Sequence, residues 1–176
     1  MKWIGISGGW RQINETIEND VRQTVAKIME RGDGIVSGGA LNVDSAALDE
    51  ALKHDALAQR IKIFLPTTLE KLSEHYRKHA RLGTITAAQA ENLIKQLSAL
   101  RQINSSALIE NPDINFTEEN KKAKYYERNA KVVEASDELV AFCVRTQASE
   151  GLGTADTIRK AAAKGIPIDL HSYDLT

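Results

Sequence analysis

A glycine-rich turn between a strand and a helix is the feature that most constrains how this chain can fold. Residues 34–36 are a short apolar run, residues 37–40 read Ser-Gly-Gly-Ala, and residues 44–52 are rich in alanine and leucine. Ligands of open α/β sheets bind at such strand exits. Glycine allows positive φ and close approach of a ligand. The helix start then suits a phosphate or carboxylate, although a tight turn without a ligand would look the same in sequence.

The same pattern occurs at two further places. The apolar run at residues 3–7 is followed by Gly8 and Gly9, which gives Ser7-Gly8-Gly9. The apolar run at residues 138–144 is followed by Ser149-Glu150-Gly151-Leu152-Gly153-Thr154. The carboxyl ends of parallel strands meet at one edge of a sheet, so three such turns would form one nest of N–H groups for an anion. The spacing matches neither a Walker A loop nor G-x-G-x-x-G.

The order of the elements predicts the fold class. Strands at 3–7, 34–36 and 61–65 alternate with helical patterns, and further strands follow at 138–144 and 167–170. This alternation predicts a three-layer Rossmann-like α/β fold, in which a parallel sheet of about five strands is covered by helices on both faces.

Residues from about 80 to 127 break the alternation. Thr86 and Gln89 have the spacing of a capping box, and an apolar stripe that includes Leu93 and Leu97 follows. We expect a helical insertion on the sheet, because the segment is too short to bury a good core alone. The whole chain, 1–176, is therefore predicted to be a single domain.

Charge and cysteine content narrow the partners and the compartment. The net charge of −1 gives no overall basic field for nucleic acid. Residues 121–131 interleave lysine, arginine and tyrosine, which suits phosphates and bases but is more typical of a solvated helix face. The single Cys143 excludes an internal disulfide. No membrane-length apolar run or signal peptide pattern occurs, so we expect a cytoplasmic protein.

Three segments resemble one superfamily, which joins the DNA-processing protein A (DprA/Smf) family with the Lonely Guy (LOG) family. Residues 37–52 resemble the DprA pattern S-G-x-A-x-x-x-D-x-x-A-H-x-x-A-L, with Leu48 in place of the histidine. Residues 128–136 resemble the DprA segment R-N-R-x-I-x-x-x-S. Residues 151–155 are similar to the LOG motif G-G-x-G-T-x-x-E and to the T-A of DprA, with Glu150 at the first motif glycine. The resemblance covers most of the chain outside the insertion and implies a Rossmann-like nucleotide-binding domain.

The strand exits and the resemblance together define the candidate ligand-binding residues. Asp44 either caps its helix or hydrogen-bonds to the ligand or the neighbouring glycine turn. Arg128 precedes the strand at 138–144, which favours a place in the groove over a surface charge. His75 and His79 stand four apart on a predicted helix but lack a third ligand, so we predict no metal site and no cofactor. The predicted ligand-binding residues are Ser7, Gly8, Gly9, Arg11, Ser37, Gly38, Gly39, Asp44, Arg128, Asn129, Gly151, Gly153 and Thr154.

The resemblance also bears on catalysis. In LOG enzymes the final glutamate of the motif helps to break an N-glycosidic bond, and Thr157 stands at that position here. A threonine cannot act as a carboxylate base or stabilise a developing oxocarbenium charge. Asp156 is one residue away and would point about 100° around the helix.

We therefore predict that the chain binds a nucleotide or nucleotide-like phosphate ligand without catalysis. Two alternatives remain open: a LOG-like phosphoribohydrolase of nucleoside 5′-monophosphates, and a DprA-like protein that binds single-stranded DNA. The expected partner is a small phosphate-bearing molecule. A homodimer is expected through the apolar face around Leu93 and Leu97. The sequence does not identify the ligand or the pathway.

Overall fold

The computed structural model describes residues 1–147 and 151–175. Ser149 and Glu150, which belong to the third predicted turn, lie outside the described residues. The elements are β1 (Trp3–Gly8), α1 (Glu15–Glu30), β2 (Gly34–Ser37), α2 (Val43–His54), β3 (Ile61–Phe64), α3 (Leu69–Arg81), α4 (Ala87–Ile103), β4 (Leu108–Ile109), α5 (Lys121–Glu134), β5 (Glu138–Arg145), α6 (Leu152–Lys164) and β6 (Ile168–Asp174).

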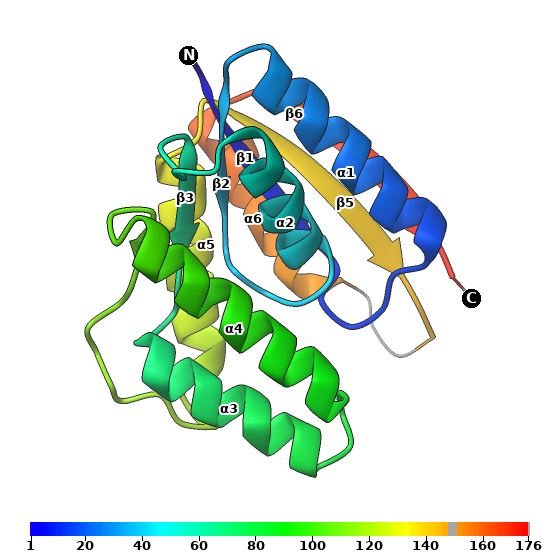
Figure 1. Cartoon of the computed structure of the whole chain (residues 1–176). Coiled ribbons are helices and arrows are strands. Elements are labelled where there is room, and N and C mark those ends of the chain that lie inside the picture. The colour runs from blue at the N-terminus through cyan, green and yellow to red at the C-terminus, as the bar shows by residue number, and fades with distance from the viewer. Residues whose placement is uncertain (148–150, 176) are drawn as a thin grey trace.

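The strands form one parallel sheet in the order β4-β3-β2-β1-β5-β6. Figure 1 labels these strands apart from the short β4. This parallel sheet confirms the predicted Rossmann-like α/β fold. The chain moves outward from β1 through β2, β3 and β4, and then returns to the other side of β1 to form β5. In open α/β sheets the crevice at such a reversal, outside the carboxyl ends of the strands, is the usual ligand site.

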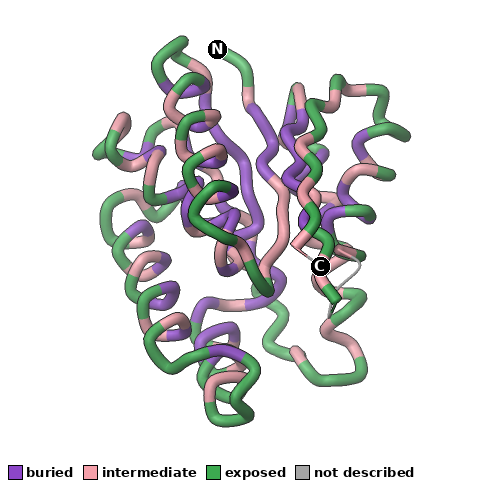
Figure 2. Tube along the Cα trace, turned by 90° about the vertical axis from the view of Figure 1, so that its right-hand side faces the viewer, coloured by how far each residue is buried: buried purple, intermediate pink, exposed green. Residues whose placement is uncertain are grey.

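Helices cover both faces of the sheet (Figure 1). The larger apolar cluster joins α1, α2 and α4 to Ile4, Ile35 and Ile63 of the strands. The smaller cluster places Val133 of α5 and Ala161 of α6 against β5 on the other face. Figure 2 shows buried strands at the centre and exposed outer helix surfaces.

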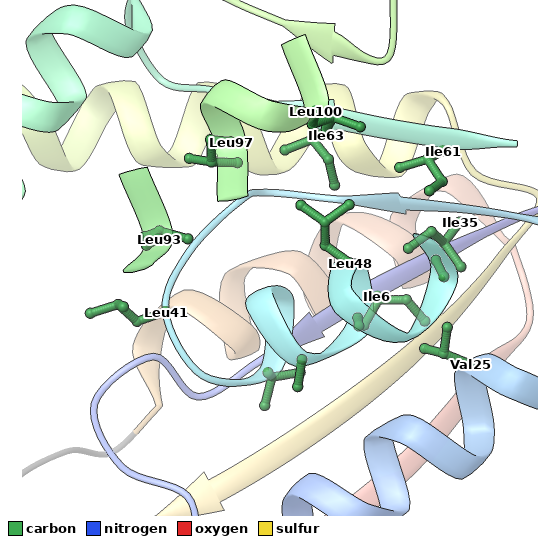
Figure 3. Close-up of a cluster of buried hydrophobic side chains, with 14 of the residues drawn as sticks. Ile6, Val25, Ile35, Leu41, Leu48, Ile61, Ile63, Leu93, Leu97 and Leu100 are labelled. Carbon is green, nitrogen blue, oxygen red and sulfur yellow. The ribbon is translucent and has the colours of Figure 1, made fainter. Parts of the chain in front are cut away.

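The apolar stripe of α4 is used inside the molecule. Leu93 and Leu97 are 2% and 1% exposed and belong to the larger cluster, near Leu41 and Ile63 (Figure 3). The predicted capping box is present, because Gln89 N–H donates to Thr86 Oγ1 and Thr86 N–H donates to Gln89 Oε1. The stripe therefore offers no surface for the homodimer that was predicted through it.

The sheet has one strand more than the sequence predicted. Leu108 and Ile109 pair with Ile63 and Phe64 to form β4, within the segment that was predicted as a helical insertion without a strand. The last strand also continues beyond 170, as far as Asp174. None of the described helices combines the length and apolar character that a bilayer crossing needs.

Candidate functional site

A cavity of about 450 Å³ lies where β1, β2 and β5 end, and we call it the strand-end cavity. It brings together all four segments that the sequence singled out: the turns after β1, β2 and β5, and the Arg128-Asn129 pair of α5. Its lining residues are Ile6, Ser7, Gly8, Gly9, Trp10, Arg11, Gln12, Gly38, Ala40, Asp44, Arg128, Asn129, Val132, Val144, Thr146, Gly151, Leu152, Gly153, Thr154 and Thr157.

A hydrogen bond links the turn after β1 to the turn after β2. Asn42 Nδ2 donates to the Trp10 carbonyl oxygen at 2.6 Å, which links the turn before α2 to the turn after β1. Asn42 has φ of 65° and ψ of −104°, a backbone conformation that is uncommon for a residue other than glycine. Gly8 lies against Val43, the first residue of α2. The wall formed by β1 and α2 is therefore closely packed.

Asp44 supports the second turn from inside α2. Its Oδ2 accepts the Ala40 N–H at 3.1 Å and lies 3.8 Å from Arg128 Nη1. Burial raises the pKa of the Asp44 carboxyl, while the Arg128 guanidinium and the Ala40 N–H act in the opposite direction. Of the two alternatives left open by the sequence, the structure shows the hydrogen bond to the glycine turn.

Arg128 reaches from α5 to the same turn. Its Nη1 donates to the Gly38 carbonyl oxygen, and its guanidinium lies over the Tyr125 ring, 5.4 Å from the centroid. A Cβ on Gly38 would overlap the guanidinium, so glycine is what allows this approach. The side chain is 11% exposed, and its Nε is buried without a hydrogen-bond partner among the described residues.

Asn129 of α5 forms hydrogen bonds to the third turn and the start of α6. Its Nδ2 donates to the Gly153 carbonyl oxygen at 3.3 Å and to Asp156 Oδ2 at 3.0 Å. Gly151 stands at the N-cap position of α6 with φ of 69°, a conformation that favours glycine. The first turn of α6 thereby faces the cavity, with Gly153 and Thr154 in its lining. Arg128 and Asn129 thus connect α5 to two different turns.

Thr157, at the LOG glutamate position, and its neighbour Asp156 have different surroundings. Thr157 lines the cavity and donates its hydroxyl to the Gly153 carbonyl oxygen at 3.1 Å. Asp156 is not in the cavity lining; its buried carboxylate lies 2.6 Å from Lys160 Nζ. Among the described residues, the carboxylate in the lining is Asp44, which already accepts the Ala40 N–H.

Eleven of the thirteen predicted site residues line the strand-end cavity. Ser37, which is fully buried at the end of β2, is not in the lining. Gly39 is not in the lining either; a Cβ there would meet Ile63 and Leu65 of the core. Thr146 lines the cavity and was missed, since nothing in the sequence marks the residue after β5. A role in ligand binding remains a prediction for all of these residues.

The histidine pair lies outside the strand-end cavity. The rings of His75 and His79 are 4.4 Å apart between centroids, and His75 also contacts Phe116 edge-on at 5.2 Å. Burial lowers the pKa of His75 to about 4, with a further contribution from His79. Within the described ranges, no group of three or more metal-ligating side chains occurs.

Comparison with known proteins identifies the fold. No family model and no curated protein matches the sequence. The structure is similar to DNA processing protein A from Helicobacter pylori, described with a single-stranded DNA binding mode, with a TM-score of 0.64 and 19% identity. That match covers 96% of this chain, which spans 64% of the length of the Helicobacter protein.

Two other similar structures carry a different ligand in their names. The molybdenum cofactor binding protein from Rippkaea orientalis has a TM-score of 0.60 at 18% identity, covering 99% of this chain and 78% of that protein. The molybdenum cofactor carrier protein from Chlamydomonas reinhardtii has a TM-score of 0.55 at 15% identity, covering 98% and 79%. These likenesses, at 15–19% identity, show that the chain shares the fold of these proteins.

Proposed function

We propose that this chain, which shares its fold with DNA processing protein A and with molybdenum cofactor carriers, binds a small nucleotide-like phosphate ligand in the strand-end cavity. The observation that carries the proposal is the convergence of three glycine turns and Arg128 on one cavity. Such a nest of backbone N–H groups favours an anion.

Two features of the lining support a phosphate group in particular. The first turn of α6 supplies the positive end of a helix dipole, which stabilises a nearby negative charge. Arg128, which lines the cavity, supplies a permanent positive charge. A volume of about 450 Å³ is within the usual range for small-molecule sites. Asp44 opposes an anion less than a free carboxylate would, because Arg128 and the Ala40 N–H offset its charge.

Binding without glycosidic cleavage is part of the proposal. Thr157 offers a hydroxyl where cleavage needs a carboxylate, and the Asp156 carboxylate is paired with Lys160 outside the lining. The lone Cys143 supports a reducing compartment, such as the cytoplasm, for this function.

The first prediction concerns Arg128. Replacing Arg128 with alanine removes a charged donor, and a hydrogen bond to a charged group contributes about 1.5–3 kcal/mol. We expect the Kd for AMP or inorganic phosphate, measured by isothermal titration calorimetry, to rise roughly ten- to a hundredfold. Arg77→Ala is the matched control, because Arg77 is exposed on α3 and pairs with Glu91 outside the cavity. Equal affinities in both variants would contradict the proposed site.

The second prediction concerns turnover. Purified protein incubated with AMP, CMP, GMP or UMP should release no free base, because general acid–base assistance typically supplies about 10²–10⁴-fold in rate and no free carboxylate is available in the described lining. Thr157→Glu is the informative variant, since it restores a carboxylate at the cavity. Base release by the unaltered protein on the order of 1 s⁻¹ would overturn the non-catalytic assignment.

A second candidate function, binding of single-stranded DNA, is favoured by one specific observation. Helix α5 carries five basic and two acidic residues and α6 carries three basic and one acidic, and the two helices pack together on one face of the sheet. The ammonium groups of Lys122 and Lys160 both lie over the Tyr126 ring there, 5.6 and 5.1 Å from its centroid. An oligonucleotide titration at increasing salt tests it, since phosphate contacts give a steep loss of affinity.

A further inference from the structure

The far side of β6 is an unusually long open edge for this sheet. Within the described residues the sheet ends at β6, which has seven residues, whereas the opposite edge strand, β4, has two. The Leu139 N–H donates to the Pro167 carbonyl oxygen and the Leu175 N–H to the Arg145 carbonyl oxygen, both at 2.9 Å. The N–H and C=O groups of successive residues alternate in direction along a strand. Since the Pro167 C=O and the Leu175 N–H point toward β5, the N–H and C=O groups of Ile168, Leu170 and Ser172 point away from β5.

This edge lacks most of the devices that usually prevent pairing. Proteins protect long edge strands with charged side chains, above all lysine, or with proline, a bulge or a covering element. The acidic side chains of β6 are those of Asp169 and Asp174. Residues 168–174 contain neither lysine nor proline, and they pair with β5 in an uninterrupted register. Leu170 is 55% exposed, while Ile168 packs against the smaller apolar cluster. In Figure 1 the strand lies at the margin of the sheet, behind α1.

We propose that β6 pairs antiparallel with β6 of a second copy of this chain, around a two-fold axis at Leu170, so that one sheet runs through both copies. Antiparallel addition of a strand to an open edge is an established mode of recognition. A two-fold interface must be self-complementary. The β6 edge meets that condition, because outward-directed residues face outward-directed residues: Leu170 lies opposite the partner's Leu170, and Ile168 opposite the partner's Ser172.

The side chains select this register over its neighbour. Directly opposed residues lie on the same face of a sheet. Pairing at Leu170 sets two exposed leucines together on one face and sets Asp169 against the partner's His171 on the other. Pairing at His171 would instead set Leu170 against serine and two imidazoles against each other. The favoured arrangement joins apolar with apolar and carboxylate with imidazole.

Solution mass tests the pairing. At high micromolar concentration, light scattering should give twice the chain mass of 19.4 kDa. Leu170→Lys places two like charges directly opposite each other, and the dimer Kd should rise at least tenfold. Leu57→Lys, at a position 66% exposed outside β6, is the control and should leave the Kd unchanged. Thermal unfolding checks that both variants fold. A monomer mass for the unaltered chain, or an equal Kd in both variants, would overturn the proposal.

A disulfide test examines the register itself. In a Cys143→Ala background, Leu170→Cys should crosslink on oxidation, because hydrogen-bonded antiparallel partners have Cα atoms about 5.5 Å apart, within disulfide range. Ser172→Cys should not crosslink, because the two Ser172 residues of the dimer would lie roughly 13 Å apart along the strands. Crosslinking through position 172 without crosslinking through position 170 would overturn the assignment.

Discussion

Gly8 shows how a single residue sets the shape of the candidate site. A Cβ at this position would lie 2.5–2.6 Å from three carbons of Val43, including its Cβ. A change in the Val43 side-chain rotamer cannot relieve a clash with the Cβ itself, so β1 or α2 would have to move. Gly38 differs, because a Cβ there would meet the guanidinium at the end of the Arg128 side chain. One glycine therefore maintains packing and the other admits a functional side chain.

The third prediction follows from Gly8. Gly8→Ala should lower the free energy of unfolding by about 1–3 kcal/mol, the usual cost of overpacking a core. Urea unfolding measures it. Gly153→Ala is the matched control: a Cβ there has no neighbour within 4 Å, and alanine is the better helix former in α6. A loss of stability at Gly153 as large as at Gly8 would show that close packing is not the cause.

Among the elements, α5 does most to organise the site. Neighbouring residues on this helix, Arg128 and Asn129, hold the turn after β2 and the start of α6, respectively. Val132 and Val133 of the same helix are buried. The helix thus anchors two turns that lie 24 to 90 residues away in sequence. Motif resemblance could single out Arg128-Asn129, but only the fold shows that both side chains contact protein carbonyls.

The elements also show which parts of the fold were readable from sequence. Glycine turns, caps and alternating apolar runs predicted β1, β2, β3 and β5, because these signals are local. The strand β4 was not predicted, because two residues are too few to show a strand pattern in the sequence. Its strand conformation is defined by its pairing with β3. The same limit applies to Leu93 and Leu97, whose apolar stripe is compatible with either an internal core or an interface until the neighbouring elements are known.

At the scale of the whole molecule, an aromatic and histidine cluster connects separate parts of the chain. His75 and His79 of α3 contact each other, Phe116 of the loop before α5, and Trp10 of the turn after β1. The cluster therefore joins the segment that follows β3 to the rim of the strand-end cavity. His79 Nδ1 is buried without a hydrogen-bond partner among the described residues, so no described hydrogen bond stabilises a proton on that nitrogen.

Protonation of this cluster should weaken the whole fold, which is the last prediction. Burial, then His79 and Lys121, lower the pKa of His75 to about 4, below its ordinary value of 6.5, and burial lowers the pKa of His79 as well. The unfolded chain therefore binds more protons than the folded chain between these values. Stability should fall as pH decreases from about 6.5 towards 4. Urea unfolding across this range measures the slope, and His75→Phe, which keeps a ring that cannot be protonated, should flatten it. An identical slope in both proteins would place the pH dependence elsewhere.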